Sequence, residues 1–190
     1  MKKLLSILKI TFLLLFFHVS TVVSNPIIGA GATFPYPLYS EMFIQYFKEF
    51  GIQINYQAIG SGGGVRHLSN KLVDFGATDA YTNSDIVKTL NEDIVYVPTC
   101  LSGISIVYNV PGHPKLNLDA ETIADIYLGK IKRWNDKRIE KLNPDVDLSS
   151  KRIMPVHRSD SSGTTFIFTE FLTKYSEKFK SKIGQGKSVP

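Results

Sequence analysis

The chain has 190 residues, with 22 Lys and Arg against 17 Asp and Glu and a formal net charge of +5. Residues 1–24 contain three of the lysines and no acidic residue, so residues 25–190 carry only +2, which is not the composition of a nucleic-acid-binding protein. The single cysteine, Cys100, excludes an internal disulfide and a cysteine-based metal site. We therefore expect no nucleic-acid partner, no metal and no cofactor.

Residues 1–24 have the pattern of a secretory signal peptide. Lys2 and Lys3 precede an almost wholly apolar stretch at residues 4–17, and small or modest side chains follow at residues 22–24. The unbroken apolar run, residues 12–17, is too short to span a bilayer. The sequence thus predicts an exported protein, with an uncleaved N-terminal anchor as the alternative.

Residues 27–33 are predicted to form a strand that leads through a glycine-rich turn into a helix. Aromatic side chains recur at i, i+4, i+7, i+8 and i+11 between Tyr39 and Phe50, which is typical of one helix face. Gly51 is predicted to end that helix.

The same unit then repeats in form. A strand at 52–59 leads into the turn Gly60-Ser61-Gly62 and a short helix, with Ser61 a plausible N-cap. A third strand is predicted at 73–77, ending at Asp79, and a helix at 83–90.

The rest of the chain continues the alternation. Strands are predicted at 94–97 and 103–110, followed by a loop at 111–114 and a helix that Asp119 caps. A strand at 152–157 then precedes a polar turn and a final helix. Strands alternating with helices predict an α/β fold with mostly parallel sheets, and the loop near residue 111 suggests a second lobe.

Three turns share one design, in which a strand ends in small polar residues that open a helix. They are Ala32-Thr33-Phe34, Gly60-Ser61-Gly62 and Ser161-Ser162-Gly163-Thr164. In an open parallel sheet such turns lie at the carboxyl ends of the strands, where ligands bind. Helix N-termini expose backbone N–H groups and a partial positive charge, so three converging turns predict an anion site. Simple helix capping is the alternative for each turn taken alone.

Two charged residues refine the prediction. The Arg158 guanidinium can hold two oxygens of an oxyanion, although a surface salt bridge with Asp160 is the alternative. Asp79 should repel an anion unless that anion carries a proton, as hydrogen phosphate does, because an ionised carboxylate only accepts hydrogen bonds. Arsenate would pass this test, whereas sulfate would fail it; a structural Asp cap remains the alternative role for Asp79.

Other functions have weaker support. The turn Ser161-Ser162-Gly163 could hold the nucleophile of a phosphate-ester hydrolase with His157 as its base, but no G-x-S-x-G elbow is present. The Gly-Lys-Ser at residues 186–188 resembles the end of a P-loop, yet Ser181 stands where its first glycine is required. The basic and aromatic run at 130–134 is read as a solvated helix end, with nucleic-acid binding or contact with a membrane permease as alternatives.

The combined motifs resemble the periplasmic phosphate-binding proteins of high-affinity phosphate ABC importers, within the type II periplasmic binding protein superfamily. The matching stretches are GAGATFPYPLY (29–39), NYQAIGSGGGV (55–65), VDFGATDA (73–80), IADIYLGKIKRWND (123–136) and HRSDSSGTTFIFTEFL (157–172).

The resemblance implies a binding protein, not an enzyme. Its fold would be two α/β lobes that close on one phosphate, with residues 25–102 as the first lobe, 103–110 as a hinge strand region and 111–190 as an incomplete second lobe. The C-terminal part of the fold is expected to lie beyond this chain. A monomer is expected in the periplasm, or tethered to the membrane if residues 1–24 are retained, with permease subunits as partners. The implied phosphate-binding residues are Thr33, Phe34, Ser61, Asp79, Arg158, Asp160, Ser162, Gly163 and Thr164.

Overall fold

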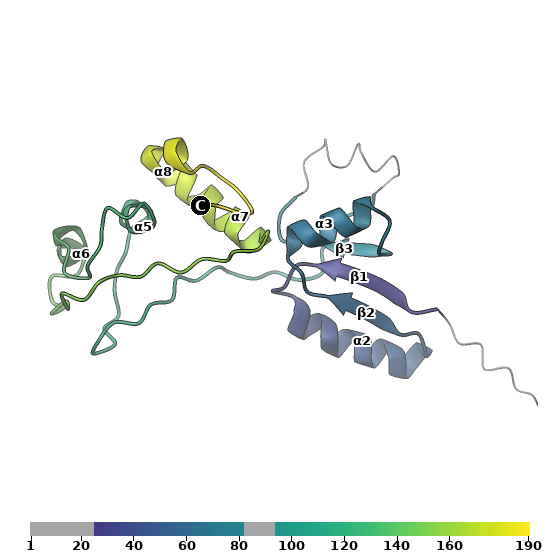
Figure 1. Ribbon diagram of the computed structural model, residues 1–190. Coiled ribbons are helices and arrows are strands. Elements are labelled where there is room, and N and C mark those ends of the chain that lie inside the picture. The colour runs from purple at the N-terminus through teal and green to yellow at the C-terminus, as the bar shows by residue number, and fades with distance from the viewer. Residues whose placement is uncertain (1–24, 82–93) are drawn as a thin grey trace, which may run out of the picture.

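The computed structural model describes residues 25–81 and 94–190. The predicted signal peptide and the predicted helix at 83–90 lie outside these residues. Figure 1 shows two bodies, which we name the sheet body (residues 25–81) and the helical body (residues 111–190). Two extended segments, around residues 98–110 and 149–160, run between them.

The sheet body is built on three parallel strands. They are β1 (Ile27–Gly31), β2 (Ile54–Gln57) and β3 (Phe75–Ala77), in the order β2-β1-β3. In register, Gly29 of β1 lies between Tyr56 of β2 and Phe75 of β3. Because all three strands run the same way, the turns that follow them lie at one edge of the sheet.

Helices α2 (Tyr36–Phe50) and α3 (Ser61–Ser69) cover opposite faces of this sheet (Figure 1). On the α2 face, Tyr39 packs with Ala32 and Ala77. Helix α3 lies so close to β1 that a Cβ on Gly64 would come within 2.4 Å of the Gly31 Cα. Only glycine permits this approach, because any side chain would push the helix off the sheet.

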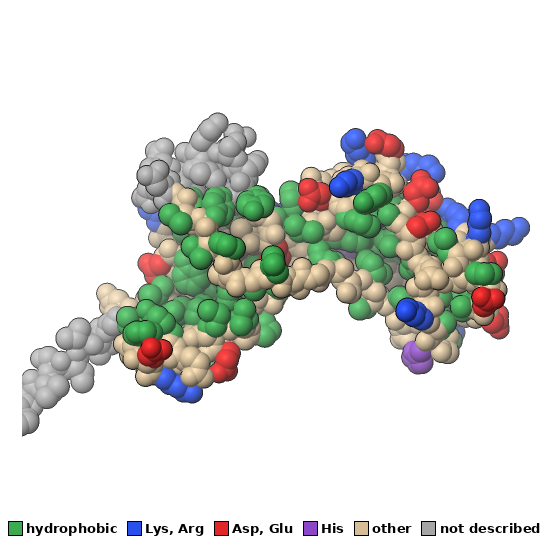
Figure 2. Space-filling model, turned by 180° about the vertical axis from the view of Figure 1, so that it is seen from behind, with side chains coloured by type: hydrophobic (Ala, Val, Ile, Leu, Met, Phe, Trp, Pro, Cys, Tyr) green, Lys and Arg blue, Asp and Glu red, His purple; other side chains and the backbone are tan. Residues whose placement is uncertain are grey.

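Helix α2 forms where the aromatic spacing predicts it and ends at Gly51, whose φ of 69° is left-handed. The face itself is covered only in its first half, because the paired strands are short. Tyr39 is buried, but Phe47 and Phe50 are 52% and 56% exposed. Hydrophobic side chains accordingly spread over the surface of this body (Figure 2).

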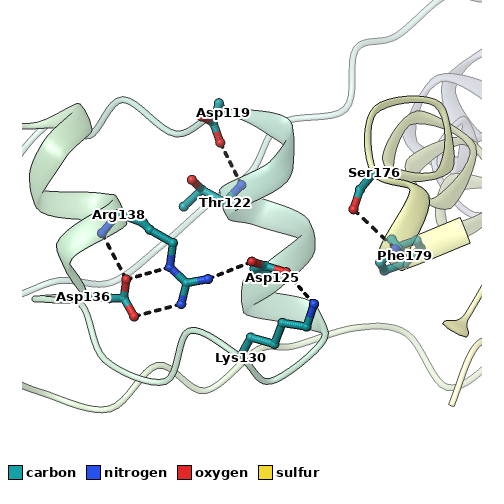
Figure 3. A network of polar contacts seen from close by, with 8 residues as sticks. All are labelled: Asp119, Thr122, Asp125, Lys130, Asp136, Arg138, Ser176 and Phe179. Atoms are coloured by element: carbon teal, nitrogen blue, oxygen red, sulfur yellow. Dashed lines mark hydrogen bonds and ion pairs between the residues drawn. The ribbon is translucent and has the colours of Figure 1, made fainter. Parts of the chain in front are cut away.

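The helical body consists of α5 (Ala120–Tyr127), α6 (Lys137–Leu142), α7 (Gly163–Tyr175) and α8 (Glu177–Lys182). The predicted cap is confirmed, since the Asp119 side chain accepts from the Thr122 N–H at 2.7 Å (Figure 3). Two apolar clusters hold the body together. One surrounds Trp134 and Ile139, and the other joins α5, α7 and α8 through Ile123, Leu172 and Phe179.

Four local predictions were wrong. The segments 94–97 and 103–110 pair with no strand among the described residues, and in 152–157 only Arg152 forms a bridge, with Arg133. A strand needs a partner for its backbone groups, so β-branched composition alone does not create one. Gly60, not Ser61, is the N-cap of α3, since Ser61 is already the first helical residue. Within the described ranges, no helix is both long and apolar enough to cross a bilayer.

Candidate functional site

The sheet body contributes three predicted site residues from one edge of the sheet. Thr33 lies two residues past β1, Asp79 lies two residues past β3, and Ser61 opens α3 after β2. The completely buried Ser61 hydroxyl accepts the backbone N–H of Asp79 at 3.2 Å. The side chain predicted to cap α3 therefore links the turn after β2 to the turn after β3.

The helical body brings the N-terminus of α7 to the same edge. Ser162 is the N-cap, and its buried hydroxyl accepts from the Thr165 N–H at 3.2 Å. Gly163 follows with no room for a side chain, because a Cβ there would lie 2.3 Å from the Ser61 hydroxyl and 2.8 Å from the Asp79 Cβ. The α7 terminus, with its partial positive charge, therefore lies directly against Ser61 and Asp79.

Arg158 joins the two bodies. Its Nη2 donates to the Thr33 hydroxyl at 3.1 Å, and its Nε donates to Asp160 Oδ1 at 2.7 Å. A second guanidinium–carboxylate contact makes the Asp160 pair bidentate. This pairing lowers the pKa of Asp160 and raises that of Arg158, so both side chains are charged at neutral pH. Asp160 thus orients a permanent cation toward Thr33.

A main-chain contact reinforces this junction. The Gly62 N–H donates to the Ser161 carbonyl at 3.0 Å, joining the second turn to the third. Gly60 has a φ of 81°, and a Cβ there would lie 2.7 Å from Asp160 Oδ2. Gly60 therefore lies close to the Asp160 carboxylate and has a left-handed backbone conformation, and both features favour glycine at this position.

Asp79 is the most unusual group of the site. Its Oδ2 accepts from the Thr164 hydroxyl at 3.1 Å, but its Oδ1 is buried without a hydrogen-bond partner among the described residues. Burial raises the pKa of Asp79, although the Thr164 bond and the nearby Arg158 charge oppose the shift. A buried acceptor without a donor costs free energy, so Asp79 Oδ1 is suited to a ligand that brings a proton.

Phe34 completes the predicted set. Its side chain is 40% exposed and lines a cleft that Asp79 and Thr164 also line, together with the apolar side chains of Ile123 and Phe168. All nine predicted site residues consequently lie at or next to one junction of the two bodies. Within the described ranges, no group of three or more potential metal ligands is present.

Lys187 is a neighbour that the sequence did not predict. Its carbonyl accepts the Ser162 N–H at 2.9 Å, and Gly186 is tied to the Thr169 hydroxyl at 3.0 Å, so the segment folds back along α7. Burial lowers the pKa of the Lys187 amine, and the Asp79 charge opposes that shift. The only sequence signal here was the P-loop-like Gly-Lys-Ser, which gave no indication of this contact.

The residues proposed for hydrolysis are not arranged for it. The Ser162 hydroxyl is buried in its capping bond, whereas His157 is exposed and its Nδ1 contacts the Arg158 carbonyl at 3.1 Å. A nucleophile needs its base within hydrogen-bond reach. Among the described residues, no hydrogen bond joins His157 to Ser161 or Ser162, so the geometry gives no support to a hydrolase.

A protein-family model described as a PBP superfamily domain matches residues 19–188, which is most of the chain. The chain belongs to the PBP superfamily. Solved structures support the same fold for this PBP domain. A substrate-binding protein of Clostridium perfringens, named for a phosphate ABC transporter and solved with bound phosphate, aligns at a TM-score of 0.57 and 21% identity, covering 78% of this chain and 56% of that one.

An ABC-type phosphate transport receptor from Vibrio cholerae aligns at a TM-score of 0.50 and 17% identity, covering 79% of this chain and 56% of that one. At these identities the likeness shows the fold alone. Together with the parallel sheet, it confirms the predicted α/β periplasmic-binding-protein fold.

Curated relatives of the PBP domain are closer in sequence. "Phosphate-binding protein PstS" of Haemophilus influenzae is 46% identical over 168 residues, covering 87% of this chain and 50% of the relative. The Pasteurella multocida protein of the same name is 44% identical over 188 residues, covering 98% of this chain and 52% of the relative. Both are named as binding proteins. The chain spans about half the length of the curated relatives it matches.

Proposed function

We propose that this chain binds inorganic phosphate, as hydrogen phosphate, at the junction of the two bodies. The observation that carries the proposal is the buried Asp79 Oδ1, an acceptor without a donor, beside a site otherwise built for an anion. Hydrogen phosphate supplies the missing proton, while sulfate and molybdate at neutral pH have none to give. Arsenate in its protonated form is the remaining rival.

In the proposed complex each part of the site meets one need of the ligand. Arg158, fixed by Asp160, supplies charge, and Thr33 and Ser61 supply hydroxyl donors. The backbone N–H groups of Phe34 and Gly163 supply further donors, while Ser162 caps α7 and Thr164 holds Asp79 through its hydroxyl. Lys187 adds a second positive charge beside Asp79. A micromolar site requires about −8 kcal/mol. Charge-assisted hydrogen bonds contribute about 1.5–3 kcal/mol each, so several of them suffice after the cost of association.

The wider role follows from the relatives. We propose that the mature protein is exported to the periplasm, closes two lobes on phosphate across the 103–110 hinge region, and delivers it as a monomer to the permease of an ABC importer. Residues 1–24 would act as the signal, 25–102 as the first lobe and 111–190 as part of the second. The names of the PstS relatives and the PBP fold support this role.

Isothermal calorimetry on the purified chain tests the binding proposal, with phosphate and sulfate as paired titrants and circular dichroism to verify folding. The parent should bind phosphate and leave sulfate unbound. Asp79→Asn should admit sulfate, because a neutral amide no longer repels a fully ionised oxyanion. A folded parent that binds no phosphate would overturn the function, and an Asp79→Asn variant that still rejects sulfate would overturn the role of Asp79.

A further inference from the structure

Arg133 and Arg152 form an unusual pair on the helical body. They are partners in an isolated antiparallel bridge, flanked by two backbone hydrogen bonds, Trp134 N–H to the Lys151 carbonyl at 3.1 Å and Ile153 N–H to the Lys132 carbonyl at 2.9 Å. Directly opposite residues of an antiparallel pair project from the same side, with Cβ atoms about 4.5–5.5 Å apart. Two exposed arginines are therefore held face to face on a fixed backbone.

No carboxylate of the described residues forms an ion pair with either arginine. Arg133 instead donates from Nη1 to the Ser150 carbonyl at 2.6 Å, which fixes its position without neutralising it. Like charges directly opposite each other destabilise a strand pair. The chain thus retains an unfavourable arrangement whose compensating anion is not among its own described groups.

The neighbouring cations, unlike this arginine pair, form ion pairs with carboxylates. Lys130 and Arg138 both bind Asp125, and Arg138 also binds Asp136 (Figure 3). Carboxylates are therefore available a few residues away, yet the structure directs them to other partners. Trp134, the aromatic residue of the same run, is only 9% exposed and offers no surface for stacking against a nucleotide base.

The net positive charge of the chain also lies in the helical body, which carries the arginine pair. Residues 111–190 contain 15 Lys and Arg against 10 Asp and Glu, whereas residues 25–110 contain 4 against 7. In the space-filling view most of the visible basic side chains lie on the helical body, where acidic side chains are interspersed among them (Figure 2). This separation orients the molecule in the field of any extended anionic surface, with the helical body foremost.

We propose that the opposed pair of Arg133 and Arg152 forms a contact site for the anionic headgroups of a lipid bilayer. A bilayer is favoured over an acidic protein for two reasons. The two guanidinium groups lie on an exposed surface and are not enclosed in a pocket, and Lys and Arg side chains gain free energy near an anionic leaflet without specific partners. The proposal is independent of phosphate binding. Such a contact site would hold a protein that delivers phosphate close to a membrane importer.

Vesicle co-sedimentation tests the site with the full chain. Vesicles of phosphatidylcholine containing about a third phosphatidylglycerol are compared with pure phosphatidylcholine, and the neutral background is subtracted because it includes any insertion of apolar residues 1–24. Arg133→Gln/Arg152→Gln should weaken the anionic component about tenfold at low salt. Lys178→Gln/Lys182→Gln removes the same charge from exposed positions of α8 and should weaken it less than twofold. Arg133→Lys/Arg152→Lys should bind like the parent.

Each other result would overturn the proposal. Equal losses in the two Gln variants would mean that net charge alone, without this pair, drives binding. A chain that shows no preference for anionic vesicles would exclude the lipid surface as its partner. A chain that binds immobilised polyglutamate instead of vesicles would exclude it as well. Phosphate calorimetry on Arg133→Gln/Arg152→Gln should match the parent, so a failure of the proposed phosphate function would appear there and leave the vesicle result intact.

Discussion

The two bodies hold their parts of the candidate site in different ways. Thr33, Ser61 and Asp79 follow paired parallel strands, so the register of the sheet fixes their positions. Arg158 comes from an extended segment without a strand partner among the described residues, and contacts with the sheet body itself hold it in place. The comparison teaches that strand pairing positions the part of the site in the sheet body, whereas contacts between the two bodies position Arg158.

Arg158→Ala should break this comparison most severely. The substitution removes the permanent cation and the bond to Thr33, and it leaves Asp160 as an uncompensated negative charge beside Gly60. Loss of two charge-assisted bonds corresponds to roughly 100-fold weaker phosphate binding. Calorimetry should show this loss, an intermediate loss for Arg158→Lys, which keeps the charge without the fork, and none for Arg66→Ala on the exposed side of α3. Unchanged affinity in Arg158→Ala would contradict the proposed role of Arg158 in binding phosphate.

Gly163→Ala should separate the bodies without removing any polar group. The added Cβ would overlap the Ser61 hydroxyl and approach Asp79, so α7 must shift away from the sheet edge. We expect about tenfold weaker phosphate binding, since overpacking of this kind costs about 1–3 kcal/mol. Glu170→Ala is the control, because it changes an exposed position of the same helix away from the junction. If both variants bind alike, close contact between α7 and Ser61 is not needed.

Asp79→Asn should have a smaller effect, which is a change in the free energy of unfolding of the protein without phosphate. Burial raises the pKa of Asp79 in the folded state, so between its ordinary value and that raised value the folded chain holds a proton that the unfolded chain has released. Stability is therefore lost as pH rises through this range. Without phosphate, urea unfolding should show Asp79→Asn more stable than the parent by about 1 kcal/mol at pH 7 and by less in acid.

Asp145→Asn, at an exposed position, is the control for removing one charge. It should change the free energy of unfolding little at either pH. A parent chain that is more stable than Asp79→Asn at pH 7 would contradict the view that the carboxylate is poorly compensated.

The elements that could be predicted are those whose signal is local. The aromatic spacing of α2, the Asp119 cap and the Gly51 stop each depend on neighbours within a few turns, and each is found in the structure. The predicted strands at 94–97 and 103–110 failed because pairing depends on a distant partner that a β-branched run does not specify. Ser61 was misread for the same reason, since its hydroxyl serves Asp79, eighteen positions away, and not its own helix.

The candidate site shows the same limit. Small polar turns after strands indicated where Thr33 and Ser61 would converge, because the ends of parallel strands share one edge. Gly163 joins them although the strand predicted before its turn does not form. The Lys187 carbonyl that receives the Ser162 N–H could not be foreseen, because a backbone acceptor has no identity in the sequence. The opposed pair of Arg133 and Arg152 was equally hidden, since it depends on the register of a single bridge.

If the proposed function holds, the buried Asp79 oxygen without a hydrogen-bond partner should affect the melting temperature of the chain. A ligand that binds only the folded chain raises its stability by mass action, by about 2.7 kcal/mol at a hundred times its dissociation constant. An anion that brings a proton satisfies Asp79 and gains this stabilisation, whereas one without a proton meets the same charge unrelieved. The melting temperature of the chain should therefore rank oxyanions by whether they are protonated, which makes a simple thermal shift series a measure of ligand chemistry.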